Sequence, residues 1–222
     1  MKSYKDTYQH RGLRRNLVTE LKQKGITDDA VLATIGKIPR HFFFEKTFVE
    51  WAYQDKAFPI GNSQTISQPY TVAFQTQLLE IKKRDSVMEI GTGSGYQAAV
   101  LASMGARVYT IERHEALSLS AKKKLQSMGY QGIRFYYKDG YKGLPEFAPF
   151  DKILVTAAAP TIPDALKQQL KIGGMLVIPV GDRKGQQMLR ITRLSVSEFG
   201  MEKKGNFRFV PFVKGINPVK KG

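Results

Sequence analysis

Three glycines at alternate positions, Gly91, Gly93 and Gly95, form the motif in this chain that most directly predicts chemistry. They follow a short apolar run at 86–90 and precede a helix-forming stretch at 97–104. Glycine allows positive φ angles and lets a ligand lie against the main chain, which a Cβ atom would prevent. The start of the helix would leave free N–H groups facing that ligand. The pattern predicts a strand, a cofactor-binding turn and a helix, although a purely structural turn would have the same glycines.

The spacing of these glycines separates one class of nucleotide cofactor from another. The dinucleotide fingerprint Gly-x-Gly-x-x-Gly needs its third glycine at position 96, where this chain has Tyr96. A phosphate-binding P-loop needs Gly-Lys followed by Ser or Thr, which is absent after Gly95. Glu112 ends the next apolar run, 107–112, where a carboxylate can accept hydrogen bonds from both ribose hydroxyls. A ribose with a free 2′-hydroxyl is therefore favoured over one with a 2′-phosphate.

The pattern from Glu89 to Gly95, with Glu112 at the end of the second strand, resembles S-adenosylmethionine-dependent methyltransferases of the Rossmann-like class. The resemblance implies S-adenosylmethionine as the donor and S-adenosylhomocysteine as the product. Asp139 and Gly140 follow the third strand-like run, where a carboxylate would lie near an adenine ring. An ordinary Asp-Gly turn explains this pair equally well. The expected donor-binding residues are Glu89, Gly91, Thr92, Gly93, Ser94, Gly95, Glu112, Arg113, Asp139 and Gly140.

Apolar strand-like runs alternate with helical patterns from residue 85 onward. The runs lie at 86–90, 107–112, 133–138, 151–156 and 175–180. Such alternation is typical of βαβ units, and it predicts a parallel sheet with helices on both faces. Two further runs, 187–194 and 206–213, are expected to pair antiparallel at the sheet edge. We therefore expect an α/β fold with seven strands that binds its ligands at the carboxyl ends of the strands.

The first 60 residues have helical patterns and no clear strand. Residues 14–24 have the spacing of an amphipathic helix, and Thr27 is expected to cap a second helix. We expect 1–60 to form a helical cap on a donor-binding core at 61–222, the two together making a single domain. Within that core, a Gly-Gly pair indicates a turn after a helix at 162–171.

The composition excludes several classes of protein. With 222 residues the chain can bury one sizeable core. It has no cysteine, which excludes disulfides, thiolate metal sites and cysteine nucleophiles. Its three histidines, His10, His41 and His114, are scattered along the sequence, which favours packing or surface roles over a metal site. Without an apolar run long enough to span a bilayer, the chain is expected to be a soluble, cytoplasmic protein. It is also expected to be a monomer.

The charge balance raises the question of nucleic acid. Lys and Arg outnumber Asp and Glu by 35 to 19, which gives a formal net charge of +16. These charges are spread along the chain and are not interleaved with aromatic residues in a binding motif. The lysines at 122–124 fall mostly on the polar faces of an expected helix at 115–128. The pattern argues against a nucleic-acid partner, but an RNA methyltransferase and a non-enzymatic binding module are kept as alternatives.

The chemistry of possible acceptors narrows the reaction. Methylation at C5 of a pyrimidine normally needs a cysteine, which this chain lacks. Methylation of an exocyclic base amine typically uses Asn/Asp-Pro-Pro-Tyr/Phe after the fourth strand, where 156–160 reads Thr-Ala-Ala-Ala-Pro. Upstream, Pro69 suits the first position of a helix, so Ser67 and Gln68 would lie at an N-terminus that favours a carboxylate. A simple capping role for either residue is an equal alternative.

The segment from Gln64 to Tyr70, preceded by 57–61, closely resembles the signature of protein-L-isoaspartate O-methyltransferases. Further segments that resemble this family, in the same order, lie at 88–96, 155–160, 173–181 and 207–212. The resemblance implies methyl transfer from S-adenosylmethionine to the free α-carboxylate of L-isoaspartyl residues in damaged proteins and peptides, which begins repair through a succinimide. The implied partners are therefore isoaspartyl-containing proteins and peptides, with no membrane.

The same resemblance implies a mechanism without a general base or a metal. The acceptor is already ionised at neutral pH, because α-carboxyl groups titrate near ~3.5. The Ser67 hydroxyl is expected to orient it, while the three glycines seat the methionine part of the donor, Glu112 holds the ribose and Asp139 the adenine side. The residues implied in lining the path of the peptide are Thr65, Ile66, Gln68, Pro69, Tyr70, Val210 and Pro211.

Overall fold

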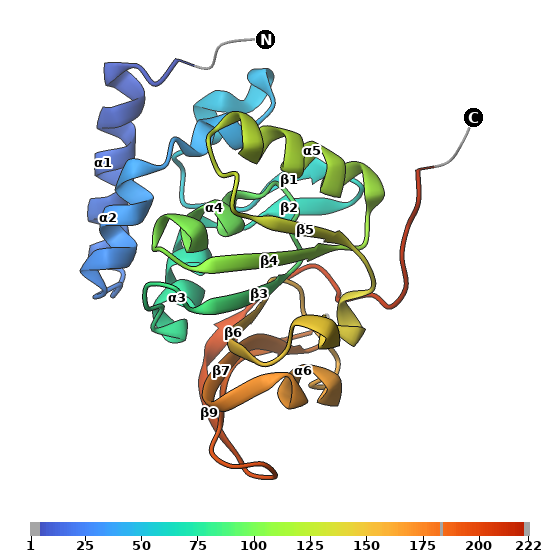
Figure 1. Ribbon diagram of the computed structural model, residues 1–222. Helices are drawn as coiled ribbons and strands as arrows, with labels where there is room; N and C mark the ends of the chain where they lie inside the picture. Colours follow the sequence, from blue (N-terminus) through green and yellow to red (C-terminus); the bar gives the residue numbers. More distant parts are fainter. Residues whose placement is uncertain (1–4, 183, 220–222) are drawn as a thin grey trace.

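A computed structural model describes residues 5–182 and 184–219 of the protein. Its centre is a twisted sheet with the strand order β5-β4-β3-β6-β7-β8-β9 (Figure 1). Strands β5, β4, β3, β6 and β7 run parallel to one another. At one edge, β8 pairs antiparallel with β7, and β9 pairs antiparallel with β8. The strands are β3 (Ser86–Ile90), β4 (Arg107–Glu112), β5 (Arg134–Tyr137), β6 (Phe150–Val155), β7 (Leu170–Gly181), β8 (Gln186–Arg193) and β9 (Phe199–Phe207). The predicted α/β fold, a Rossmann-like sheet with an antiparallel edge, is confirmed.

Helices cover both faces of this sheet. The α-helices are α1 (Tyr8–Gln23), α2 (Asp29–Lys37), α3 (Pro69–Leu79), α4 (Tyr96–Ser103), α5 (Glu115–Ser127) and α6 (Asp164–Gln168). Short 3-10 helices are η1 (Arg40–Phe43), η2 (Lys46–Trp51), η3 (Gly140–Lys142) and η4 (Pro145–Phe147). Successive residues of a strand point to opposite faces, so Val87 belongs to the core cluster that includes residues of α1 to α4, while Met88 belongs to the cluster that includes residues of α6 and η4. Both core layers thus meet on β3, the strand that leads into the glycine loop.

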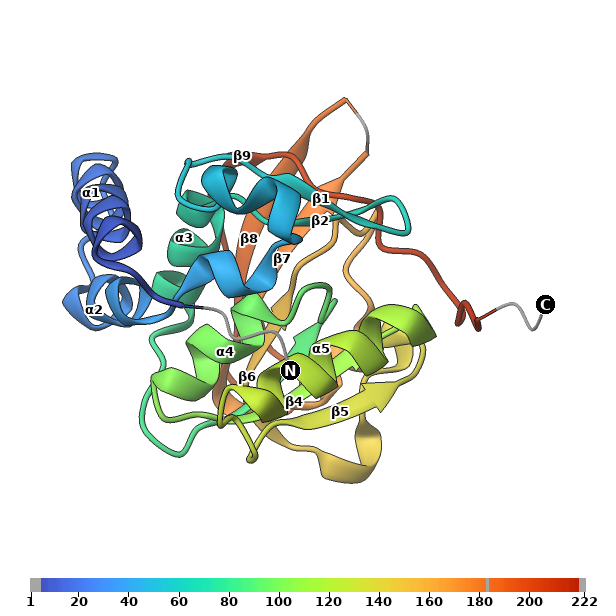
Figure 2. The ribbon, with the colours of Figure 1, turned by 90° about the horizontal axis from the view of Figure 1, so that it is seen from above.

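The N-terminal helices α1 and α2 lie together at one side of the sheet (Figures 1 and 2). Helix α1 begins six residues before the predicted start, because Thr7 and His10 form a reciprocal capping box that apolar spacing does not reveal. The expected cap at Thr27 is wrong. Asp28 is the N-cap of α2, since its carboxylate accepts from the N–H groups of Ala30 and Val31. Of the expected cap and core, residues 1–4, 183 and 220–222 lie outside the described residues.

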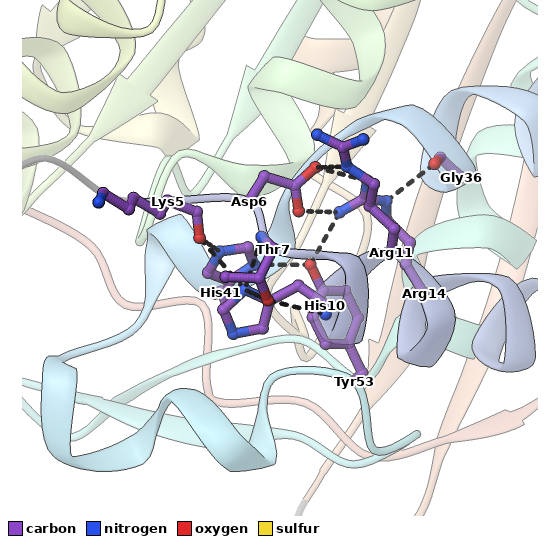
Figure 3. A network of polar contacts seen from close by, with 9 residues as sticks. All are labelled: Lys5, Asp6, Thr7, His10, Arg11, Arg14, Gly36, His41 and Tyr53. Atoms are coloured by element: carbon purple, nitrogen blue, oxygen red, sulfur yellow. Dashed lines mark hydrogen bonds and ion pairs between the residues drawn. The ribbon is translucent and has the colours of Figure 1, made fainter.

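Two of the three histidines come together where the N-terminal segment packs on η1 (Figure 3). The rings of His10 and His41 stack with their centroids 3.8 Å apart, and Asp6 lies close to both. The carboxylate of Asp6 accepts hydrogen bonds from Arg14 at 2.9 and 3.0 Å. Because a guanidinium already neutralises this carboxylate, we interpret the cluster as a packing network that fixes α1, not as a metal site.

The hairpin at the sheet edge and the region before it differ from the sequence prediction. Strand β9 spans Phe199–Phe207, not 206–213, because a turn closes at once where the N–H of Leu194 bonds to the carbonyl of Glu198. As an edge strand, β9 is largely exposed and lacks an apolar run, so hydrophobic periodicity does not predict it. The predicted helix at 162–171 is only five residues long, and the Gly-Gly pair lies inside the long strand β7.

A small hairpin that the sequence did not predict precedes α3. Strands β1 (Phe58–Gly61) and β2 (Gln64–Ile66) pair antiparallel, with Asn62 and Ser63 at positive φ in the turn. This hairpin ends directly at Ser67 and the start of α3. No helix in the described part of the chain is long and apolar enough to cross a membrane.

Candidate active site

A cleft opens at the carboxyl ends of β3, β4 and β6, where an open parallel sheet binds its ligands. It holds about 830 Å³ of space free of atoms, part of which is open solvent. Its walls come mainly from β2 and the residue after it, from the segments after β3, β4, β5 and β6, and from the chain after β9. The expected site residues that line it are Thr65, Ile66, Ser67, Gly91, Thr92, Gly93, Ser94, Glu112, Arg113, Gly140, Val210 and Pro211. Segments predicted separately as donor and acceptor sites therefore share one cleft.

The glycine loop needs its glycines for close packing as well as for its backbone angles. A Cβ at Gly91, where φ is +98°, would overlap the hydroxyl of Thr156, which itself donates to the carbonyl oxygen of Gly91. A Cβ at Gly95 would come within 2.8 Å of Leu125 in α5. Gly95 itself does not line the cleft but is the N-cap of α4. The loop is thus pressed against β6 on one side and α5 on the other, with its open face toward the cleft.

Glu112 joins the glycine loop to the end of β4. Its side chain is 5% exposed, and one carboxylate oxygen accepts the N–H of Gly93 at 2.9 Å while the other accepts the N–H of His114, also at 2.9 Å. A carboxylate oxygen can accept more than one hydrogen bond, so both retain capacity toward a ligand in the cleft. This geometry suits the recognition of two neighbouring hydroxyls.

Glu89 lies beneath the loop and does not line the cleft. It is fully buried and accepts a hydrogen bond from Thr110, whose hydroxyl is 2.6 Å from that of Thr92. Burial raises the pKa of Glu89 to about 8, so the side chain is mostly protonated at neutral pH. Its influence on a ligand therefore passes through Thr110 and Thr92.

Asp139 also stays outside the cleft wall, while its neighbour Gly140 lines it. The Asp139 carboxylate accepts the N–H of Tyr141 at 3.0 Å, which caps η3, and that of Gly215 at 2.9 Å. Arg113 donates to the carbonyl oxygen of Gly215 at 3.1 Å. Both side chains thus hold the C-terminal segment, which runs on past α5, where the N–H of Val219 bonds to the carboxylate of Glu115 (Figure 1).

Ser67 follows the hairpin, its hydroxyl is free of hydrogen bonds to the described residues, and it lines the same cleft as the glycine loop. Its carbonyl oxygen accepts a hydrogen bond from Arg40 at 2.9 Å. The Arg40 side chain is 1% exposed, also donates to the carbonyl of Ala52 at 3.0 Å, and lies over the ring of Tyr96 at 4.7 Å. Burial lowers the pKa of Arg40 to about 10, which leaves it a cation at neutral pH.

The N-terminus of α3 is partly filled by a carboxylate of the protein itself. Asp55 accepts the N–H of Tyr70 at 2.7 Å and the side-chain amide of Gln68 at 3.0 Å, and it pairs with Lys24 at 2.6 Å. A substrate carboxylate cannot use the Tyr70 N–H while Asp55 holds it. At this helix start, only the part next to Ser67 therefore stays available to a substrate carboxylate. Gln68, the N-cap, makes no capping bond through its side chain.

Sequence reasoning missed three other features of the site. Arg40 and Asp55 lie 27 and 15 residues before the groups they bind, in segments whose local pattern gives no functional signal. Gln68 and Tyr70 line a second groove beside the cleft, and Pro69, which stands between them in the sequence, is buried. Phe212 lines the cleft beyond Val210 and Pro211, because 210–212 pairs with Ala158 in the loop after β6.

Comparison with known proteins identifies the family to which this chain belongs. Residues 12–217 match the family model for protein-L-isoaspartate(D-aspartate) O-methyltransferase. The chain belongs to this family. It is therefore an S-adenosylmethionine-dependent carboxyl O-methyltransferase. The protein-L-isoaspartate O-methyltransferase of Cytophaga hutchinsonii is 56% identical over 208 residues, 94% of either chain. That of Flavobacterium johnsoniae is 56% identical over 213 residues, 96% of this chain and all of its own.

Solved structures agree with the methyltransferase fold. A protein-L-isoaspartate O-methyltransferase matches with a TM-score of 0.81 and 28% identity over 89% of this methyltransferase, which spans 65% of that chain. A Plasmodium falciparum structure in complex with S-adenosyl-L-homocysteine has a TM-score of 0.80 and 24% identity, covering 91% of this chain and 99% of its own. The residues of the cleft fit the methyl donor S-adenosylmethionine, because they combine a bare backbone at Gly93 with a buried carboxylate at Glu112.

Proposed function

We propose that this methyltransferase transfers the methyl group of S-adenosylmethionine to the free α-carboxylate of L-isoaspartyl residues in damaged proteins and peptides, which starts their repair through a succinimide. The observation that carries the proposal is that Ser67, whose hydroxyl bonds to no described residue, lines the same cleft as Gly93 and Glu112. An acceptor held at Ser67 thus meets a donor held by the glycine loop. Alignment of this kind is the main contribution an enzyme makes when its nucleophile is already charged.

The donor contacts follow from the cleft wall. When bound, S-adenosylmethionine supplies a methyl group on a positively charged sulfur that an oxygen nucleophile can attack. The main chain of Gly91 to Ser94 receives its methionine part, the Glu112 carboxylate accepts the ribose hydroxyls, and Arg113 and Gly140 bound the adenine side. Glu89 and Asp139 do not line the cleft. Glu89 acts through its hydrogen bond with Thr110, and Asp139 acts through its hydrogen bond with Gly215.

The acceptor side needs orientation and exclusion of water. The Ser67 hydroxyl donates to the substrate carboxylate, which is ionised above pH ~3.5 and so requires no proton removal. His114 lines the cleft, but burial lowers its pKa, so it is neutral at pH 7 and adds no charge there. Thr65 and Ile66 on one side and Val210 and Pro211 on the other bound the path of the peptide, and their backbone contacts would accept many sequences.

We also propose that 1–222 acts as one domain and as a monomer in the cytoplasm. Apolar residues of α1 and α2 share one core cluster with β3 and α4, which supports the single domain. The large apolar side chains that stay exposed come from many separate elements, which supports the monomer. Light scattering coupled to size-exclusion chromatography measures the mass in solution directly.

The chemical nature of the methylated product distinguishes an isoaspartyl peptide from the alternative acceptor, RNA. Labelled S-adenosylmethionine is incubated with the enzyme and either an isoaspartyl peptide or total RNA. A carboxyl methyl ester hydrolyses in mild alkali and releases volatile labelled methanol, whereas a base-methylated RNA does not. Alkali-labile label in the peptide alone supports the proposal, and stable label in RNA contradicts it. No label and no donor affinity would indicate a non-enzymatic binding module.

A further inference from the structure

A second groove, here called the flank groove, begins where the acceptor segment ends. It lies between the start of α3, the start of β8 and the end of β9. Strands β8 and β9 stand side by side in Figure 2. Ser67 lines the cleft, while Gln68 and Tyr70 line the flank groove. A polypeptide that brings one of its carboxylates to Ser67 therefore has an adjoining channel for its next residues.

The floor of the flank groove is aromatic. The ring centroids of Tyr70 and Phe74 are 5.7 Å apart, and those of Phe74 and Phe207 are 5.1 Å apart. Each of these rings is half-buried, so one face of the cluster is available to a ligand. An aromatic floor of this kind contacts the backbone and apolar parts of an extended peptide without selecting one side chain.

The rim of the flank groove is cationic. It includes Lys184, Lys204 and Arg208, and none of its described lining residues is acidic. Lys204 pairs with Glu202 at 2.6 Å, whereas Lys184 and Arg208 form no ion pair within the described part of the chain. Of the neighbouring carboxylates, Asp182 accepts the backbone N–H of Lys184 at 2.8 Å, and Asp55, 2% exposed, pairs with Lys24.

We propose that the flank groove binds acidic residues of the substrate polypeptide on one side of the isoaspartyl residue. This inference rests on the proposed function and names a preferred class of substrate: isoaspartyl sites followed or preceded by Asp or Glu. Lys184 and Arg208 pair with these carboxylates while the aromatic floor packs against the adjoining chain. It also gives a local role to part of the +16 charge.

Three peptides of equal length test the proposal in the full-length enzyme. One carries an isoaspartyl residue with neutral neighbours, the second has two glutamates only on its N-terminal side, and the third has them only on its C-terminal side. Because the flank groove lies on one side of Ser67, only one of the two acidic peptides should show a lower KM, by about three- to tenfold as expected for two exposed ion pairs. An equal gain for both would reflect the net charge of the protein and would overturn the proposal.

A matched pair of double variants locates the effect. Lys184→Gln with Arg208→Gln should bring the kcat/KM ratio of the favoured acidic peptide over the neutral peptide close to one. Lys122→Gln with Lys123→Gln removes the same charge from the exposed side of α5 and should leave that ratio as in the wild type. Equal ratios in all three proteins would also overturn the proposal.

The controls separate this inference from the function beneath it. If the neutral isoaspartyl peptide itself is not methylated, the proposed function fails. If it is methylated but neither acidic peptide is favoured, only the flank-groove proposal fails. If an oligouridylate binds the wild type and not the Lys184→Gln, Arg208→Gln protein, while acidic peptides gain nothing, the occupant is a nucleic acid and the proposal is wrong.

Discussion

Arg40 donates a hydrogen bond from a terminal guanidinium nitrogen to the carbonyl oxygen of Ser67, at 2.9 Å. The same buried guanidinium lies over the ring of Tyr96, the first residue of the helix that follows the glycine loop. One cation in the N-terminal part of the chain therefore touches both the acceptor segment and the base of the donor site. It fixes the distance between two segments that the reaction must bring into register.

Replacing Arg40 with Met should weaken both the fold and acceptor binding. The change leaves the carbonyls of Ala52 and Ser67 without their donor, which should cost about 2–4 kcal/mol of unfolding free energy. Urea unfolding measures this loss. At a temperature where the variant is still folded, the KM for an isoaspartyl peptide should rise more than the Kd for S-adenosylhomocysteine. Arg40→Lys keeps the charge and should recover part of the stability. Equal changes in KM and Kd would show that Arg40 does not position the acceptor.

Ser67→Ala should lower kcat/KM for an isoaspartyl peptide by about tenfold to a hundredfold, the range for a lost hydrogen bond to a charged group. Since the hydroxyl bonds to no described residue, stability and donor affinity should stay as in the wild type. Ser127→Ala, at the exposed end of α5, is the control. Unchanged peptide kinetics in Ser67→Ala would remove the hydroxyl from the mechanism.

Glu112→Gln should raise the Kd for S-adenosylhomocysteine roughly tenfold or more, because an amide offers one acceptor oxygen where the carboxylate offers two. Isothermal titration calorimetry measures the change. Glu115→Gln alters the neighbouring acid, which bonds instead to the N–H of Val219, and should bind the donor product normally. Similar affinities in both variants would contradict the assignment of the ribose to Glu112.

Glu89 should make stability depend on pH. Its folded pKa, about 8, lies above the ordinary value of 4.5 because the side chain is buried, so its protonated form stabilises the fold. This contribution is fully present below pH 4.5 and is lost as the pH rises through 8. Glu89→Gln, a neutral mimic, should lose less stability between pH 5 and pH 8 than the wild type, whereas Glu50→Gln on the surface should follow the wild type. Parallel curves for all three proteins would indicate an ordinary pKa for Glu89.

The donor half of the site was predictable because its chemistry is local. Gly91, Gly93 and Gly95 stand within five residues, and Glu112 ends the next strand, so the spacing alone indicates the loop and its partner. The sequence placed Glu89 and Asp139 in direct contact with the donor. The structure places them behind the wall, because an acid at a strand end can face either a ligand or the backbone beside it.

The acceptor half was only partly predictable because long-range contacts build it. Ser67 follows from the Pro69 helix start, but neither Arg40 nor Asp55 has a local pattern that connects it to that segment. The hairpin before Ser67 and the edge strand β9 were missed because both are short of buried side chains, and apolar periodicity is the main signal for a strand. The flank groove depends on β9 and therefore could not be predicted from the sequence.

The most direct test of the central claim is labelled methyl transfer from S-adenosylmethionine to two peptides that differ only in one linkage, isoaspartyl or ordinary aspartyl. The wild type should form an alkali-labile methyl ester on the isoaspartyl peptide and none above background on its aspartyl twin. Equal labelling of the two peptides, or labelling of neither, would contradict the account.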